Sequence, residues 1–310
     1  MQKKVIYEIK SLYRDDFQVM GYEFGSGENS VCIVGNTRGN EIQQIYVCSQ
    51  LVKRLKAMEE EGKISEGHKI LVIPSINPYS VNIQKRFWTT DNTDINRMFP
   101  GYHLGETTQR IAAGVFEEIK DYRYGMQFTS FYMPGKFTPH VRMMKTGFED
   151  IELAKKFGMP YIILRNTRPY DTTTLNYNWQ IWETNAFSIY TTSTNSIDTA
   201  SEKMAIRSVL TFMNKEGIVE YQGHDGYISS VVDDRDMISV RTKMSGIFEK
   251  IVGVGDEVEK GQPLANIINP YEGEIVETLE APADSIVFFA HDEPITYANT
   301  AVYKLIVKKA

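Results

Sequence analysis

The chain has few cysteines, fewer basic than acidic residues, and no long apolar run. Its 310 residues include only Cys32 and Cys48 as cysteines, too few for the disulfide framework of a small secreted protein. The formal net charge of −6 argues against nucleic acid or an anionic membrane as a partner, because both require a basic face. The first residues lack the apolar core of a signal peptide, and no run approaches the roughly 18 apolar residues of a membrane span. We therefore expect a cytoplasmic protein.

The chain does contain a regular alternation of apolar strands and amphipathic helices. We predict strands over 17–24, 30–34, 69–74, 126–132, 161–164 and 186–190. We predict helices over 41–60, 106–120, 148–157 and 198–216, the last capped by Asp198. Such alternation is typical of an α/β fold with a largely parallel sheet that helices cover on both faces.

The pattern changes after residue 217. From residue 241 the chain shows short alternating strands and glycine turns without a helical period, which indicates a small all-β module. The residues between are too apolar for a flexible linker. We predict an α/β domain over 1–217, a connection over 218–240 and a β-barrel domain over 241–310.

A long polar loop over 74–101 follows the strand 69–74, the place where a scaffold usually displays ligand contacts. Along this loop stand Asn77-Pro78, Arg86-Phe87, Asp91, Asp94-Ile95-Asn96-Arg97 and Phe99-Pro100-Gly101. This order of residues resembles the substrate-binding signature of the succinylglutamate desuccinylase/aspartoacylase family, a branch of the zinc carboxypeptidases. The resemblance implies a zinc-carboxypeptidase-like α/β domain, a C-terminal β-barrel domain and metal-dependent deacylation of N-acyl amino acids.

Three positions depart from the catalytic pattern of this family. The family takes two zinc ligands from His-Gly-Asn-Glu and a third from a histidine at the end of a later strand. Here Glu41 survives, Arg38 stands at the first histidine and Thr129 at the last. Tyr190 or Thr191 falls where the family has its catalytic glutamate, so no general base is identified. A guanidinium beside Glu41 would pair with the carboxylate and repel a dication.

The anion-binding half of the family site is present. By position, Arg86 matches the arginine that polarises the scissile carbonyl, and Asn96 and Arg97 match the pair that holds the substrate carboxylate. Arginine suits this task because its planar fork binds carboxylate in a bidentate manner. Arg38 and Arg142 are further candidates for ligand binding. The alternative is that these arginines pair with Asp91, Asp94 and Glu41 in a structural network.

The C-terminal module resembles biotinyl and lipoyl carrier domains in its stretches 242–267 and 280–287. A carrier needs a lysine at the hairpin between its halves, but no lysine occurs from Gly261 to Tyr303. We therefore expect no attached prosthetic group. The module is expected either to flank the pocket or to build a homo-oligomer.

Two functions remain open at this point. The first is a binding protein for a small carboxylate of the N-acyl amino acid type, with a degenerate metal site, no cofactor and little or no hydrolysis. The second is an active metal-dependent amidohydrolase that holds zinc through non-standard ligands such as Glu41 and His140. In both, the expected partner is a small molecule, and neither nucleic acid nor a membrane is expected.

Overall fold

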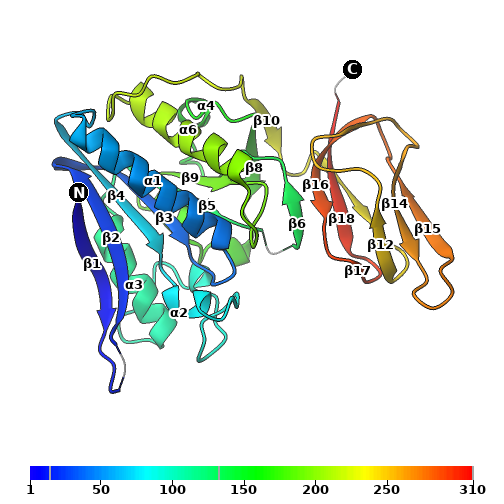
Figure 1. Ribbon diagram of the computed structural model, residues 1–310, viewed down its shortest axis with the longest axis horizontal. Coiled ribbons are helices and arrows are strands. Elements are labelled where there is room, and N and C mark those ends of the chain that lie inside the picture. Colours follow the sequence, from blue (N-terminus) through cyan, green and yellow to red (C-terminus); the bar gives the residue numbers. More distant parts are fainter. Residues whose placement is uncertain (14, 132, 309–310) are drawn as a thin grey trace. The chain divides into compact units, whose positions relative to one another are not determined.

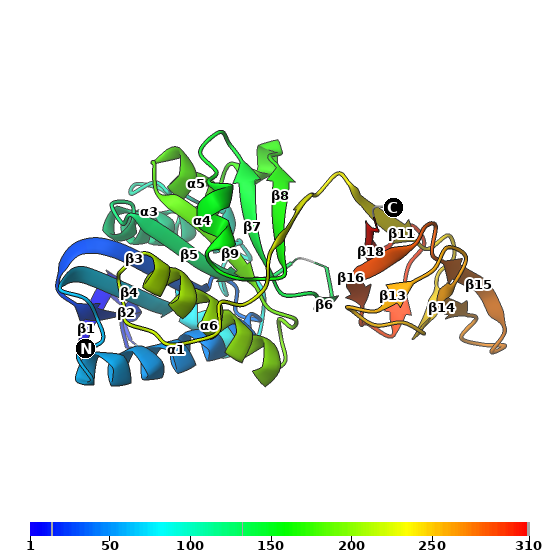
Figure 2. The ribbon, with the colours of Figure 1, turned by 90° about the horizontal axis from the view of Figure 1, so that it is seen from above.

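The computed structural model describes residues 1–13, 15–131 and 133–308. The chain divides into two compact units (Figures 1 and 2). The first comprises Met1–Ser130 and Pro139–Val231, and the second comprises Phe131–Thr138 and Val232–Ala310. A short segment from the middle of the chain thus belongs to the C-terminal unit, an arrangement that sequence periodicity does not indicate.

A nine-stranded mixed sheet forms the centre of the first unit, in the order β1-β2-β4-β3-β5-β9-β7-β8-β10. Neighbours β4, β3, β5 and β9 run parallel, as do β7 and β8, whereas β1–β2, β2–β4 and β7–β9 are antiparallel. The predicted α/β class is confirmed. The strands are β1 (Gln2–Ile9), β2 (Phe17–Gly25), β3 (Gly27–Asn36), β4 (Gly67–Ser75), β5 (Tyr124–Thr129), β7 (His140–Lys145), β8 (Tyr161–Asn166), β9 (Asn185–Tyr190) and β10 (Ser230–Asp233).

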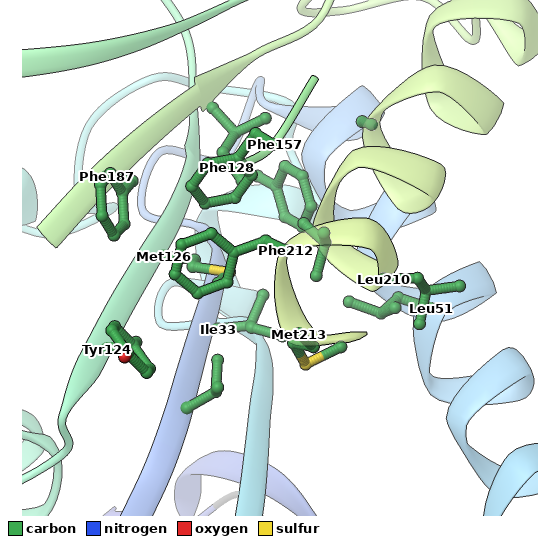
Figure 3. Packing of buried hydrophobic residues seen from close by; sticks show 14 of the residues in the cluster. Ile33, Leu51, Tyr124, Met126, Phe128, Phe157, Phe187, Leu210, Phe212 and Met213 are labelled. Atoms are coloured by element: carbon green, nitrogen blue, oxygen red, sulfur yellow. The ribbon is translucent and has the colours of Figure 1, made fainter. Parts of the chain in front are cut away.

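Helices cover both faces of this sheet because its central strands are apolar on both sides. In β3, Val31 and Ile33 point into one core, and Cys32 and Val34 into the other. Helices α1 (Ile42–Glu60) and α6 (Thr199–Lys215) supply the first core, and α3 (Thr107–Ile119) and α5 (Leu175–Ile181) supply the second. Figure 3 shows Leu210 of α6 close to Leu51 of α1 in the first core.

Short elements complete the first unit. They are α2 (Pro78–Val81), η1 (Ile95–Arg97), α4 (Ile151–Lys155) and η2 (Pro169–Asp171). The α4 helix is shorter than predicted. The predicted cap of α6 is confirmed, since Asp198 Oδ1 accepts hydrogen bonds from the amides of Ala200 at 3.0 Å and Ser201 at 2.9 Å.

At the other end of α6, Glu216 ties the helix to the rest of the unit. It accepts hydrogen bonds from Tyr124 and Lys156. Burial alone would raise the pKa of Glu216, but these two hydrogen bonds outweigh it and hold the pKa below its ordinary value. The carboxylate is therefore ionised at neutral pH and contributes stability there.

The second unit consists of two antiparallel sheets around one core. One sheet has the order β11-β18-β16-β13, with β6 paired to β16, and the other has the order β15-β14-β12-β17. Leu264, Ile267, Val302 and Leu305 are fully buried between them. The strands are β6 (Gly135–Phe137), β11 (Met237–Arg241), β12 (Gly246–Lys250), β13 (Glu257–Val258), β14 (Pro263–Ile268), β15 (Ile275–Glu280), β16 (Ser285–His291), β17 (Ile295–Thr296) and β18 (Ala301–Val307). In the part of the chain that the structure describes, no helix has the length and apolarity to cross a bilayer.

Candidate functional site

The candidate site begins where β3 passes into α1. Glu41 is the N-cap residue of α1 and is fully buried. Its Oε2 accepts hydrogen bonds from the backbone amides of Thr37 at 2.9 Å and Arg38 at 3.0 Å. Its Oε1 accepts one from Ser130 Oγ at 2.7 Å and lies 3.2 Å from Arg38 NH1. Both carboxylate oxygens are thus occupied by protein donors.

Arg38 joins Glu41 to the polar loop. Its Nε donates to Asp94 Oδ2 at 2.9 Å and to Oδ1 at 3.2 Å, while its NH1 faces Glu41. Arg38 is only 4% exposed. Burial alone would lower the pKa of Arg38, but the carboxylates of Glu41 and Asp94 outweigh it and raise the pKa. The structural network that the sequence left open is therefore present for Arg38.

Backbone packing fixes this arrangement. At Gly39, a Cβ would lie 2.3 Å from the carbonyl oxygens of both Lys85 and Ser80, so the turn after Arg38 packs against the loop without room for a side chain. Asp94 is the N-cap of η1 and accepts a hydrogen bond from the amide of Asn96 at 3.1 Å. The same carboxylate therefore shapes the loop and pairs with Arg38.

The resemblance implies a zinc ion at Glu41, but the structure places protein donors and a cation around that carboxylate. A zinc ligand needs a lone pair directed at the metal, but the oxygens of Glu41 already accept from Arg38, Thr37 and Ser130. The guanidinium also places a positive charge beside the only carboxylate that the family pattern retains. Among the described residues, no group of three or more His, Cys, Asp and Glu side chains is placed to hold a metal ion.

Arg86 lies next to this network but makes much weaker contacts. Its NH2 lies 3.6 Å from Asp94 Oδ2, an ion pair without a hydrogen bond, and its side chain is 24% exposed. None of its five N–H donors makes a hydrogen bond to another described residue. Burial lowers the pKa of Arg86, and repulsion from Arg38 and Arg97 lowers it further against the attraction of Asp94 and Glu41. An anion would relieve this unfavourable environment.

Asn96 and Arg97 follow on η1. Asn96 is buried and its Oδ1 accepts a hydrogen bond from Gln127 Nε2 at 3.1 Å, whereas its Nδ2 donates to no other described residue. Arg97 is held by the carbonyl of Tyr170 and lies 3.6 Å from Asp171 Oδ1. Its side chain remains 32% exposed. The sequence offers Asp91 and Asp94 as acidic partners within the loop, but Arg97 pairs with Asp171, which lies outside it.

The remaining candidates lie along the next strands of the sheet. Thr129 ends β5 and is paired in register with Tyr190 of β9, which in turn is paired with His140 of β7. The rings of His140 and Tyr190 stack, with centroids 4.6 Å apart. Arg142 NH1 donates to Tyr190 OH at 3.2 Å, and its guanidinium lies 4.9 Å from the ring centroid. Tyr190, one of the two residues predicted where the family has its catalytic glutamate, thus contacts both an imidazole and a guanidinium.

Sequence reasoning missed three supporting residues. Ser130 donates a hydrogen bond to Glu41, and Gln127 donates one to Asn96. Asp171 forms an ion pair with Arg97. The polar residues Gln127 and Ser130 within or beside an apolar strand were a usable signal, because a buried polar side chain requires a partner. The sequence around Asp171 contains no feature that indicates its pairing with Arg97.

Comparison with known proteins is decisive at this point. The model of the succinylglutamate desuccinylase/aspartoacylase catalytic domain matches residues 28–189. The chain belongs to the succinylglutamate desuccinylase/aspartoacylase family. A curated relative, the N-α-acetyl-L-2,4-diaminobutyric acid deacetylase of Halomonas elongata, is 24% identical over 257 residues, which are 78% of this chain and 71% of the relative.

Solved structures show the same fold over nearly the whole chain. A succinylglutamate desuccinylase from Silicibacter sp. TM1040 has a TM-score of 0.83 and 16% identity, covering 99% of this chain and 94% of that one. The product-bound ectoine utilization protein EutE from Ruegeria pomeroyi has a TM-score of 0.79 and 17% identity, covering 95% and 92%. The family prediction and the appended β domain are thereby confirmed.

Proposed function

We propose that this family member binds a small carboxylate of the N-acyl amino acid type and hydrolyses it little or not at all. The ligand carboxylate is assigned to Asn96 and Arg97, and the acyl carbonyl to Arg86. Arg38 is assigned a structural role, because it pairs with Glu41 and Asp94 and so keeps the loop in place. Arg142 contributes through Tyr190, at the edge of the same site.

The binding proposal rests on the burial and the contacts of the Arg86 guanidinium. The Arg86 guanidinium is half-buried, has Asp94 as an ion-pair partner at 3.6 Å, and makes no hydrogen bond to another described residue. Arg38 and Arg97 also repel it, and charged groups in such environments normally find hydrogen-bond partners. Asn96 Nδ2 offers a further donor on the same loop. A ligand that carries both a carboxylate and an acyl carbonyl would accept from these donors together.

The loss of hydrolysis is supported by the environment of Glu41 and by Tyr190. Deacylation requires an activated water and a base to accept its proton. Here the Arg38 guanidinium lies 3.2 Å from the Glu41 carboxylate, and the resemblance places Tyr190 or Thr191 where the family has its catalytic glutamate. Neither residue is a carboxylate, so no carboxylate base is identified at this position.

The binding proposal is tested by calorimetric titration with N-acetyl-L-aspartate, N-succinyl-L-glutamate and N-α-acetyl-L-2,4-diaminobutyric acid. We expect at least one to bind, and Arg86→Gln to weaken that binding by about 1.5–3 kcal/mol, the scale of a charge-assisted hydrogen bond. The control is Arg123→Gln, whose side chain is 67% exposed and lies outside the loop. Equal affinities of wild type and Arg86→Gln would refute the assignment.

The hydrolase alternative is tested with the same compounds. The unmodified protein is assayed for release of the free amino acid, with added zinc and with a chelator. We expect no turnover above the uncatalysed rate. Zinc-dependent turnover that the chelator abolishes would show that Glu41, with His140 or another ligand, still supports the chemistry of the relatives.

A further inference from the structure

A hollow lies between α1 and α6, which run side by side in both views (Figures 1 and 2). It has a volume of about 450 Å³, within the range of small-molecule sites. It starts nine residues after Glu41 along α1, which at 1.5 Å per residue is about 14 Å from the candidate site. The lining residues are Gln50, Lys53, Arg54, Ala57, Glu202, Lys203, Ile206, Arg207, Leu210 and Tyr221.

The charge of this hollow differs from that of the whole chain. Lys53, Arg54, Lys203 and Arg207 line it, against the single acid Glu202, although the chain carries a net charge of −6. Within the described ranges, none of the four cations makes an ion pair or a side-chain hydrogen bond. Lys53, Arg54 and Lys203 are exposed and Arg207 is partly buried, while Lys203 acts on the carboxyl of Glu202. The excess of cations over acids around the hollow attracts an anion.

The interior of the hollow is apolar on one side. Ile206 and Leu210 are one turn apart on α6 and present an aliphatic surface, and the Tyr221 ring lies beside them. Glu202 is 6% exposed and its side chain has no hydrogen bond to another described residue. Burial raises the pKa of Glu202, and the neighbouring Lys203 opposes this shift.

We propose that this hollow binds a small amphiphilic anion, whose charged head contacts the four cations and whose apolar or aromatic body lies on Ile206, Leu210 and Tyr221. A nucleotide and a fatty acid share this chemistry. The proposal is independent of the carboxylate site at Arg86, because it uses other residues and another part of α1.

The probes are ATP, laurate and inorganic pyrophosphate, titrated into the full-length protein by calorimetry. We expect ATP or laurate to bind at millimolar concentrations or below, and pyrophosphate to bind more weakly than ATP because it lacks an apolar body. Lys53→Gln combined with Arg207→Gln should weaken binding roughly tenfold, the sum of two partly exposed charge contacts. Lys53→Gln alone should weaken binding by a smaller factor, and Lys56→Gln, which also removes one charge three residues along the same helix but outside the hollow, should leave binding unchanged.

Three results would overturn the proposal. They are no binding of ATP or laurate at millimolar concentrations, pyrophosphate binding as tightly as ATP with no laurate binding, or equal losses in the Lys53/Arg207 double variant and Lys56→Gln. Binding that titrates normally in Arg86→Gln separates this hollow from the carboxylate site.

Discussion

Removing the guanidinium of Arg38 should strongly destabilise the first unit. In Arg38→Met the aliphatic part of the side chain is largely kept, while Glu41 and Asp94 lose their shared cation. Glu41 is fully buried and the Asp94 side chain is 11% exposed, so water can replace little of the lost interaction.

The magnitude follows from this burial. Removing one partner of a buried ion pair costs about 3–5 kcal/mol, mainly because the other charge stays buried. Glu41 keeps its hydrogen bonds from Thr37, the Arg38 amide and Ser130. We therefore expect a loss of unfolding free energy near the lower end of this range. For a unit of this size, 1 kcal/mol shifts Tm by about 2–4 °C, so we expect a fall of roughly 6–20 °C.

Urea unfolding monitored by circular dichroism, together with calorimetric melting, measures this effect. Arg123→Met is the matched control, because its guanidinium is mostly exposed and should matter by less than about 0.5 kcal/mol. The double variant Arg38→Met with Glu41→Gln should regain part of the loss, since one buried charge is removed with its partner. A loss below about 1 kcal/mol in Arg38→Met would refute the network as a determinant of stability.

Three further predictions follow from other parts of the structure. Arg38→His with Thr129→His should raise zinc affinity by orders of magnitude in competition titrations, since it removes the cation and supplies two ligands; unchanged affinity would mean that Glu41 is not positioned for metal. Burial raises the pKa of both Cys32 and Cys48, so a thiol reagent at about pH 8 should label them only after unfolding; rapid labelling of the native protein would contradict this. Because the folded state holds the pKa of Glu216 below its ordinary value, its stabilisation is present above the unfolded pKa of about 4.3 and is lost as pH falls through the folded pKa. Glu216→Gln should therefore cost stability in urea titrations at neutral pH and little well below pH 4, and a cost independent of pH would argue against an ionic role.

Much of the fold could be predicted because it depends on local pattern. In β3, four successive apolar residues predict a strand buried on both faces, and the spacing of Val52 and Leu55 predicts the helix that follows. The family was likewise recognisable from the run Asp94 to Gly101, because its order of residues resembles the family's substrate-binding signature. Periodicity could not assign residues 131–138 to the second unit. The strand β6 within them is too short to show a pattern of its own, and its partner β16 lies more than a hundred residues away in the chain.

The candidate site divides in the same way. The sequence alone predicted, from the resemblance, that Arg38 and Thr129 replace two zinc-ligand histidines, and it showed that arginines are present in the loop. Only the tertiary structure decided how those arginines are used: Arg38 is consumed by Glu41 and Asp94, whereas Arg86 lacks a hydrogen bond. The physical reason is that an ion pair depends on distance and burial, and these are set where β3 and the loop meet. A sequence lists the charges, but folding decides which of them are neutralised and which are left for a ligand.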